Sequence, residues 1–163
     1  MISAMLALSV RQPFAAALFR GKCVEIRSRF PAGRNPQPGE TILIHAGKEV
    51  WPGWEGLENW ENSPFALRDF WRKPDALPRG CIIGEAVFCG VERYRTAAEF
   101  AADAEEHWNN PAWFESSKNE GGCLVGLKFR DAREWREPVP FRGALGWFVV
   151  KTDTLAEVER ASG

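Results

Sequence analysis

Two apolar runs of strand length constrain the fold of this chain more than any other feature. Residues 41–46 (TILIHA) are almost entirely apolar, and residues 81–89 form a second run that continues to about Tyr94. Short runs rich in Ile, Leu and Val are typical of strands that are buried on both faces. We therefore expect these two segments to be central strands of a sheet.

Shorter segments around these runs also have strand or helix patterns. Further strands are expected at residues 6–10, 23–27, 123–129 and 146–151, and helices at residues 14–20, 63–71 and 96–108. Ser63 followed by Pro64 is typical of a helix start, after which Leu67, Phe70 and Trp71 would form the buried face. Short strands interspersed with helices favour an α+β fold built around a small β-barrel with flanking helices.

Size and composition indicate one domain spanning residues 1–163. A chain of this length with 45% hydrophobic and 12% aromatic residues can bury a substantial core. We find no internal repeat, low-complexity tract or linker. The formal net charge of −1 neither supports nor excludes nucleic acid as a partner.

The charges are distributed unevenly along the chain. Residues 1–50 carry seven Lys or Arg against three acids, whereas residues 96–117 carry five acids and no Lys or Arg. Such a split can orient a polyanion by keeping it away from one side, although both segments can equally be ordinary solvated faces.

The cysteines and histidines do not have the spacing of a metal site. Four Cys are scattered without a C-x-x-C pair, and the chain has two His, so neither a metal nor another cofactor is expected. No apolar run approaches the ~18 residues of a membrane span, and the first residues lack the basic region of a signal peptide. We expect a cytoplasmic protein with reduced cysteines and no contact with a membrane.

The densest polar cluster is Lys22-x-x-Glu25-x-Arg27. The period-two pattern places Val24 and Ile26 on the core face of the strand and Cys23, Glu25 and Arg27 on the open face. Such a group can hold a phosphate or a base edge, or place a lysine beside a carboxylate for proton transfer. The alternative is a plain surface ion pair.

Further candidate residues lie beside the predicted strands. Arg11 and Gln12 occupy a strand-to-helix junction, and His45 and Lys48 follow the buried strand at residues 41–46. Trp51 and Trp54 stand in a loop rich in Gly and Pro, where they can stack on bases or fold back on the barrel.

Five motifs in this chain occur in the order found in ASCH domains. They are Leu8-Ser9-Val10-Arg11-Gln12-Pro13-Phe14-Ala15, Lys22-x-x-Glu25-x-Arg27, Leu43-Ile44-His45-Ala46-Gly47-Lys48, Gly84-Glu85-Ala86-Val87, and Pro138-Val139-Pro140-Phe141-Arg142-Gly143-Ala144-Leu145-Gly146. Over about residues 5–151 the chain resembles that family of the PUA-like superfamily.

The resemblance implies a PUA-like barrel with a polar cleft and a role in RNA binding or nucleoside metabolism. Certain small relatives are amidohydrolases of N4-acetylcytidine with a Lys-x-x-Thr-x-Arg motif and a later glutamate, and others are credited with ribonuclease activity. Lys22 and Arg27 match the ends of that motif and Glu85 matches the later acid, but Glu25 replaces the threonine and its nucleophilic hydroxyl.

Three functions remain open from the sequence. The first is a module that binds RNA or a nucleotide through Arg11, Gln12, Lys22, Arg27 and Lys48, with Glu25 reading an exocyclic amine. The second is a hydrolase of RNA phosphodiesters or N4-acylated cytidine, in which Lys22 and either Glu25 or Glu85 activate water. The third is a protein-interaction module that uses the tryptophan-rich residues 51–71. The sequence does not indicate an oligomeric state.

Overall fold

The computed structural model describes residues 4–118, 122–151 and 153. Its strands are β1 (Ala4–Gln12), β2 (Val24–Arg27), β3 (Thr41–Val50), β4 (Cys81–Tyr94), β5 (Leu124–Pro140) and β6 (Trp147–Lys151). Its α-helices are α1 (Phe14–Ala17), α2 (Ala97–Ala102), α3 (Ala104–His107) and α4 (Phe114–Ser117). Short 3-10 helices are η1 (Trp54–Gly56), η2 (Pro64–Leu67), η3 (Pro74–Ala76) and η4 (Pro111–Trp113).

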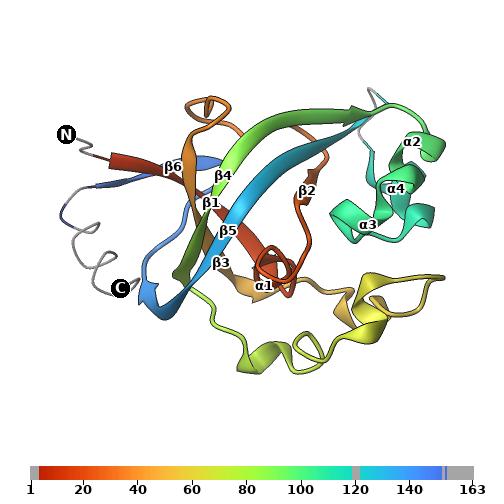
Figure 1. Cartoon of the computed structure of the whole chain (residues 1–163), viewed down its shortest axis with the longest axis horizontal. Helices are drawn as coiled ribbons and strands as arrows, with labels where there is room; N and C mark the ends of the chain where they lie inside the picture. The colour runs from red at the N-terminus through yellow and green to blue at the C-terminus, as the bar shows by residue number, and fades with distance from the viewer. Residues whose placement is uncertain (1–3, 119–121, 152, 154–163) are drawn as a thin grey trace.

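The strands form one sheet in the order β2-β5-β4-β3-β1-β6. β1 and β3 are parallel, and the other neighbouring pairs are antiparallel. The long pair β4 and β5 shifts register at three places along its length. Irregularities of this kind bend a strand and increase its twist, and the sheet curls into a partly closed barrel (Figure 1). The expected α+β barrel with flanking helices is confirmed.

The helices lie at the rim of this barrel. Figure 1 shows α2, α3 and α4 gathered beside β2, while the segment between β3 and β4 winds along another side. No helix among the described residues is long and apolar enough to cross a membrane.

The run at residues 41–46 is apolar because β3 has core on both faces. Ile42 and Ile44 belong to the larger cluster of buried side chains, whereas Leu43 belongs to a second cluster with Trp135 and Val139. The expectation of a strand buried on both sides is therefore confirmed, and it explains why period two is not visible there.

The prediction of a helix over residues 63–71 is wrong. Only η2 forms, with Ser63 Oγ accepting a hydrogen bond from the Phe65 amide at 3.3 Å. Arg68 is already extended, and Trp71 folds back so that its Nε1 donates to Phe65 O at 2.7 Å. Because the helix ends early, Leu67 is 91% exposed instead of buried.

The predicted helix over residues 96–108 is present as two short helices. Thr96 caps α2 as expected, with its Oγ1 accepting from the Glu99 amide at 3.1 Å. The helix breaks at Asp103, whose carboxylate accepts a hydrogen bond from Tyr94 Oη at 2.7 Å, and α3 then continues to His107.

Candidate functional site

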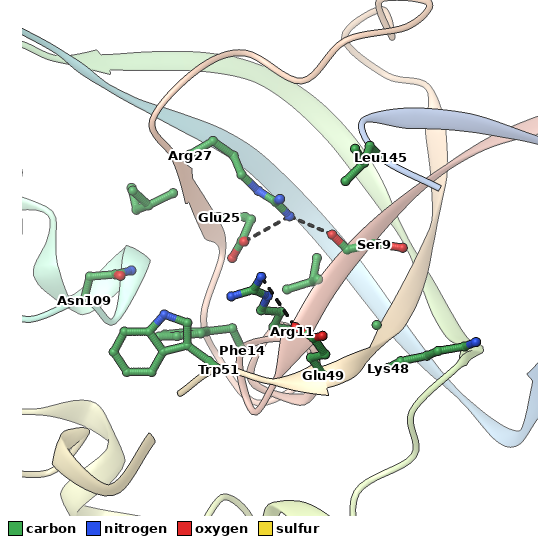
Figure 2. Close-up of a pocket in the computed structure, with 13 residues that line it drawn as sticks. Ser9, Arg11, Phe14, Glu25, Arg27, Lys48, Glu49, Trp51, Asn109 and Leu145 are labelled. Carbon is green, nitrogen blue, oxygen red and sulfur yellow. Dashed lines mark hydrogen bonds and ion pairs between the residues drawn. The ribbon is translucent and has the colours of Figure 1, made fainter. Parts of the chain in front are cut away.

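A cleft of about 510 Å³ opens where the last residues of β1 and β3 approach β2. Its walls combine charged, aromatic and small side chains from segments that are distant in the sequence (Figure 2). The lining residues are Ser9, Val10, Arg11, Phe14, Glu25, Ile26, Arg27, Gly47, Lys48, Glu49, Trp51, Asn109 and Leu145.

The charged residues at and just before β2 form a connected chain beside this cleft. Lys22 Nζ lies 2.5 Å from Glu25 Oε1, and Arg27 Nη2 lies 3.3 Å from Glu25 Oε2. Arg27 Nη2 also donates to Ser9 O at 2.7 Å, so the chain of contacts ends on β1. The structure thus brings Lys22, Glu25 and Arg27 together, as their spacing suggested.

Lys22 and Glu25 are not on an open face, which corrects the sequence-based expectation for this strand. The Lys22 side chain is 0% exposed and the Glu25 side chain 10% exposed. The helical end of the molecule covers this face, where Cys23 N donates to Glu106 O at 2.9 Å. A surface ion pair is therefore excluded for Lys22 and Glu25.

Burial lowers the pKa of the Lys22 ammonium, and the adjacent Glu25 carboxylate opposes that shift. Lys22 does not itself line the cleft; Glu25 does. The carboxylate therefore presents the buried charge pair to the cleft, with the ammonium behind it.

Arg11 and Arg27 supply the positive charge inside the cleft. Figure 2 shows Arg11, Glu25 and Arg27 directed toward one another, while Lys48 extends away from them. Arg11 Nη2 is 3.9 Å from Glu49 Oε2, a loose pair between two exposed side chains. The buried Nε of Arg27 has no hydrogen-bond partner among the described residues. The Arg11 side chain is 56% exposed and that of Arg27 31% exposed, so both guanidinium groups can donate to a ligand in the cleft.

Phe14 and Trp51 form an aromatic wall on one side of the cleft (Figure 2). Their ring centroids are 5.4 Å apart in an edge-to-face arrangement. A Cβ at Gly53 would come within 2.4 Å of the Trp51 ring, so the glycine allows the indole to lie against the backbone there. Trp54 does not line this cleft, because its ring packs near Trp71 at 6.5 Å between centroids.

Two of the expected ligand-binding residues have structural contacts instead. Gln12 is fully buried, with its Nε2 donating to Pro78 O and its Oε1 accepting from the Ala16 amide, both at 2.9 Å. His45 Nε2 lies 2.7 Å from Phe141 O and its Nδ1 lies 2.7 Å from Ser9 Oγ. Burial lowers the pKa of His45, so the ring is neutral at pH 7, and neither residue lines the cleft.

Glu85 lies apart from Lys22 and Glu25. Its Oε1 accepts hydrogen bonds from Arg133 Nη2 at 2.7 Å and from Trp135 Nε1 at 3.1 Å, and it does not line the cleft. The structure therefore does not assemble the trio Lys22, Glu25 and Glu85 around one site.

Several lining residues were not among the candidate site residues, and they include Ser9, Asn109 and Leu145. Ser9 offers its carbonyl to Arg27, Asn109 follows α3, and Leu145 stands almost fully exposed at the opening. Ser9 and Leu145 lie within two of the motifs that carry the resemblance, but nothing in the sequence near Asn109 distinguishes it from other loop residues. Among the described residues no group of three or more His, Cys, Asp or Glu is arranged to hold a metal ion.

A curled six-stranded sheet with short helices beside a polar cleft defines an α+β barrel of the PUA-like type. The crystal structure of ASCH from Zymomonas mobilis superposes on this chain with a TM-score of 0.66, covering 98% of this chain and 96% of that chain at 15% identity. Two mutant structures of that protein give a TM-score of 0.65 at 14% identity over 98% of this chain. The chain therefore has the fold of an ASCH domain. No family model and no curated protein matches the sequence.

Proposed function

We propose that this chain binds RNA or a nucleotide in the cleft between β1, β2 and β3. The observation that carries the proposal is the convergence of Arg11 and Arg27 on a cleft that is walled by Phe14 and Trp51. Guanidinium groups pair well with phosphate oxygens, and aromatic rings stack on bases. The ASCH fold supports the same proposal, because RNA binding is the usual association of that fold.

Glu25 can recognise a base in the cleft through a hydrogen bond. Each of its carboxylate oxygens already accepts one contact, from Lys22 or from Arg27. A carboxylate oxygen has two lone pairs, so Glu25 can accept a further hydrogen bond from an exocyclic amine. The contacts with Lys22 and Arg27 fix the direction of this carboxylate.

Two charge-neutralising substitutions of opposite sign test the proposal. Arg11→Gln removes a cation that is exposed and loosely paired, whereas Glu49→Gln removes the carboxylate beside it. We expect Arg11→Gln to weaken binding of a fluorescein-labelled single-stranded RNA by about tenfold and to reduce the slope of log K against log salt by about one. Glu49→Gln should strengthen binding in the same anisotropy titration.

Arg136→Gln is the matched control, because Arg136 is an exposed arginine of β5 that lines no part of the cleft. If Arg11→Gln and Arg136→Gln change the affinity and the salt slope equally, binding is nonspecific and the cleft is not the site.

The buried Lys22 favours hydrolysis as a second candidate. A lysine whose pKa is lowered by burial can act as a base, and it lies within 2.5 Å of a carboxylate. Hydrolysis of an RNA phosphodiester or of N4-acylated cytidine would require Lys22 to exchange Glu25 for a substrate or a water. Mass spectrometry of RNA and N4-acetylcytidine after incubation tests this candidate, which predicts products that are lost in Lys22→Met.

Protein docking through the tryptophan-rich segment has less support. Trp71 is buried, and Trp51 and Trp54 pack against the core, so these rings do not form a continuous exposed patch.

A further inference from the structure

A second cleft of about 600 Å³ adjoins the first on the far side of Trp51. The two clefts share Ile26, Trp51 and Asn109 as lining residues. The rest of the second cleft comes from the residue after β2, the loop before η1, the η4–α4 segment and the start of β5. These residues are Ser28, Gly53, Trp113, Ser116, Ser117 and Leu124.

The two clefts differ in charge. The first is lined by Arg11, Arg27, Lys48 and two carboxylates, whereas no Lys, Arg, Asp or Glu lines the second. Indole rings and serine hydroxyls suit an uncharged aromatic group that has polar edges, which describes a nucleobase better than a phosphate.

Trp51 separates the clefts and is held in place from several sides. Its ring centroid is 5.4 Å from that of Phe14 in the first cleft and 5.0 Å from that of Trp113 in the second. Its backbone amide donates to Gln12 O at 2.8 Å, and Gly53 lies directly against the indole. A fixed aromatic ring between two adjoining clefts is placed to separate two bases that are not stacked on each other.

Asn109 borders both spaces. Its Nδ2 donates to His107 O at 2.8 Å and its backbone amide donates to His107 Nδ1 at 3.0 Å, so the side chain is oriented by α3. Figure 2 shows the amide end of Asn109 directed toward the cleft near Trp51. A side-chain amide can hydrogen-bond to the edge of a base in either space.

We propose that the two clefts hold two consecutive bases of one single strand, with Trp51 between them and Trp113 as the stacking surface for the second base. This inference rests on the proposed function and narrows it, because the preferred ligand becomes an oligonucleotide and not a free mononucleotide. The charged cleft takes one nucleotide with a phosphate, and the uncharged cleft takes the neighbouring base.

The test compares ribonucleoside monophosphates with ribodinucleotides of A, C, G and U by isothermal titration calorimetry. We expect the best dinucleotide to bind between about fivefold and about 150-fold more tightly than its component mononucleotides, the factor given by stacking one base on an aromatic ring. Trp113→Ala should abolish this advantage and affect mononucleotide binding much less, because Trp113 lines only the second cleft.

A second variant and a control make the test independent of whether Trp113→Ala folds. Ser117 is exposed, so Ser117→Phe fills the second cleft without removing core, and it should also abolish the dinucleotide advantage. Trp60→Ala removes a tryptophan of the tryptophan-rich residues 51–71 that lines neither cleft, and it should preserve the advantage.

The outcomes separate the two proposals. If mononucleotides bind and the dinucleotide binds no more tightly, or if the substitutions at Trp113 and Ser117 leave the dinucleotide advantage intact, the two-base inference is wrong and the proposed function stands. If neither ligand binds the wild-type protein, both are overturned.

Discussion

Lys22 and Glu25 form the most deeply placed charged pair of the cleft. Their 2.5 Å contact is almost removed from solvent, since the lysine side chain is 0% exposed and the glutamate side chain 10% exposed. Removing two charges from water is costly, and their attraction offsets that cost only while both partners are present. The pair therefore fixes the position of Glu25 and makes the cleft sensitive to changes at residue 22.

We predict that Glu25→Gln lowers the free energy of unfolding by about 3–5 kcal/mol, because it leaves the buried Lys22 ammonium without its partner. Lys22→Met should lower it by less, because Glu25 keeps Arg27 as a partner. The double variant Lys22→Met/Glu25→Gln should lose clearly less than the sum of the two, since it leaves neither charge unpaired. Urea denaturation at pH 7 measures all three. Additive losses would mean that the two side chains do not interact in solution.

The sequence predicted which charged residues meet at β2 but not how deeply they lie. The alternation of a strand that begins at Val24 places Glu25 and Arg27 on one face, and Lys22 shortly precedes that strand. Their burial depends on α3, which packs against β2 from about 80 residues further along the chain, and local spacing contains no information about such a contact. The same reason explains Gln12 and His45, whose partners Pro78 and Phe141 are remote in sequence.

At the scale of elements, α3 connects the core to the wall of both clefts through His107. The ring stacks on Phe100 at 4.1 Å between centroids, Nε2 donates to Phe100 O at 2.7 Å, and Nδ1 accepts from the Asn109 amide at 3.0 Å. This arrangement requires a neutral imidazole, and burial lowers the pKa of His107 to about 4.

The lowered pKa predicts a loss of stability as the pH falls. An unfolded chain takes up the proton near pH 6.5 and the folded protein only near pH 4, so the contribution of His107 is complete above pH 6.5 and is lost between these values. We expect the free energy of unfolding to fall by about 2 kcal/mol between pH 7 and pH 5 because of His107. His45, whose pKa burial also lowers, contributes in the same direction.

Urea denaturation of the wild type and of His107→Gln across this pH range measures the effect. The glutamine retains an amide donor and an acceptor but does not titrate, so its unfolding free energy should depend less on pH. Equal pH dependence in the two proteins would show that His107 is not the responsible group.

The strands were easier to predict than the helices, for a physical reason. The runs at β3 and β4 are long and strongly apolar because both faces are buried, and that pattern has few alternatives. The segment after Ser63 has a helical start signal and apolar residues at helical spacing, but Phe65 packs on both Trp71 and Trp108 around a short 3-10 turn. Tertiary packing there overrides the local pattern.

At the scale of the whole molecule, the candidate site belongs to no single element. The cleft combines the last residues of β1 and β3, the strand β2, the loop after α3 and the turn before β6 (Figures 1 and 2). Each motif could be found in the sequence, but the parallel pairing of β1 with β3 is what places Arg11 near Lys48 and Trp51. The second cleft was not predicted from the sequence, because Trp113 and the serines of α4 belong to none of the five motifs.

Photo-cross-linking of a thiouridine-containing single-stranded RNA, followed by mass spectrometry of the peptides, maps where the RNA touches the protein. We expect adducts in the segments that line the two clefts, foremost the peptide that contains Trp51, and fewer of them in Arg11→Gln. Adducts confined to surfaces outside both clefts, such as the stretch of β5 around Arg136, would contradict binding in the cleft between β1, β2 and β3.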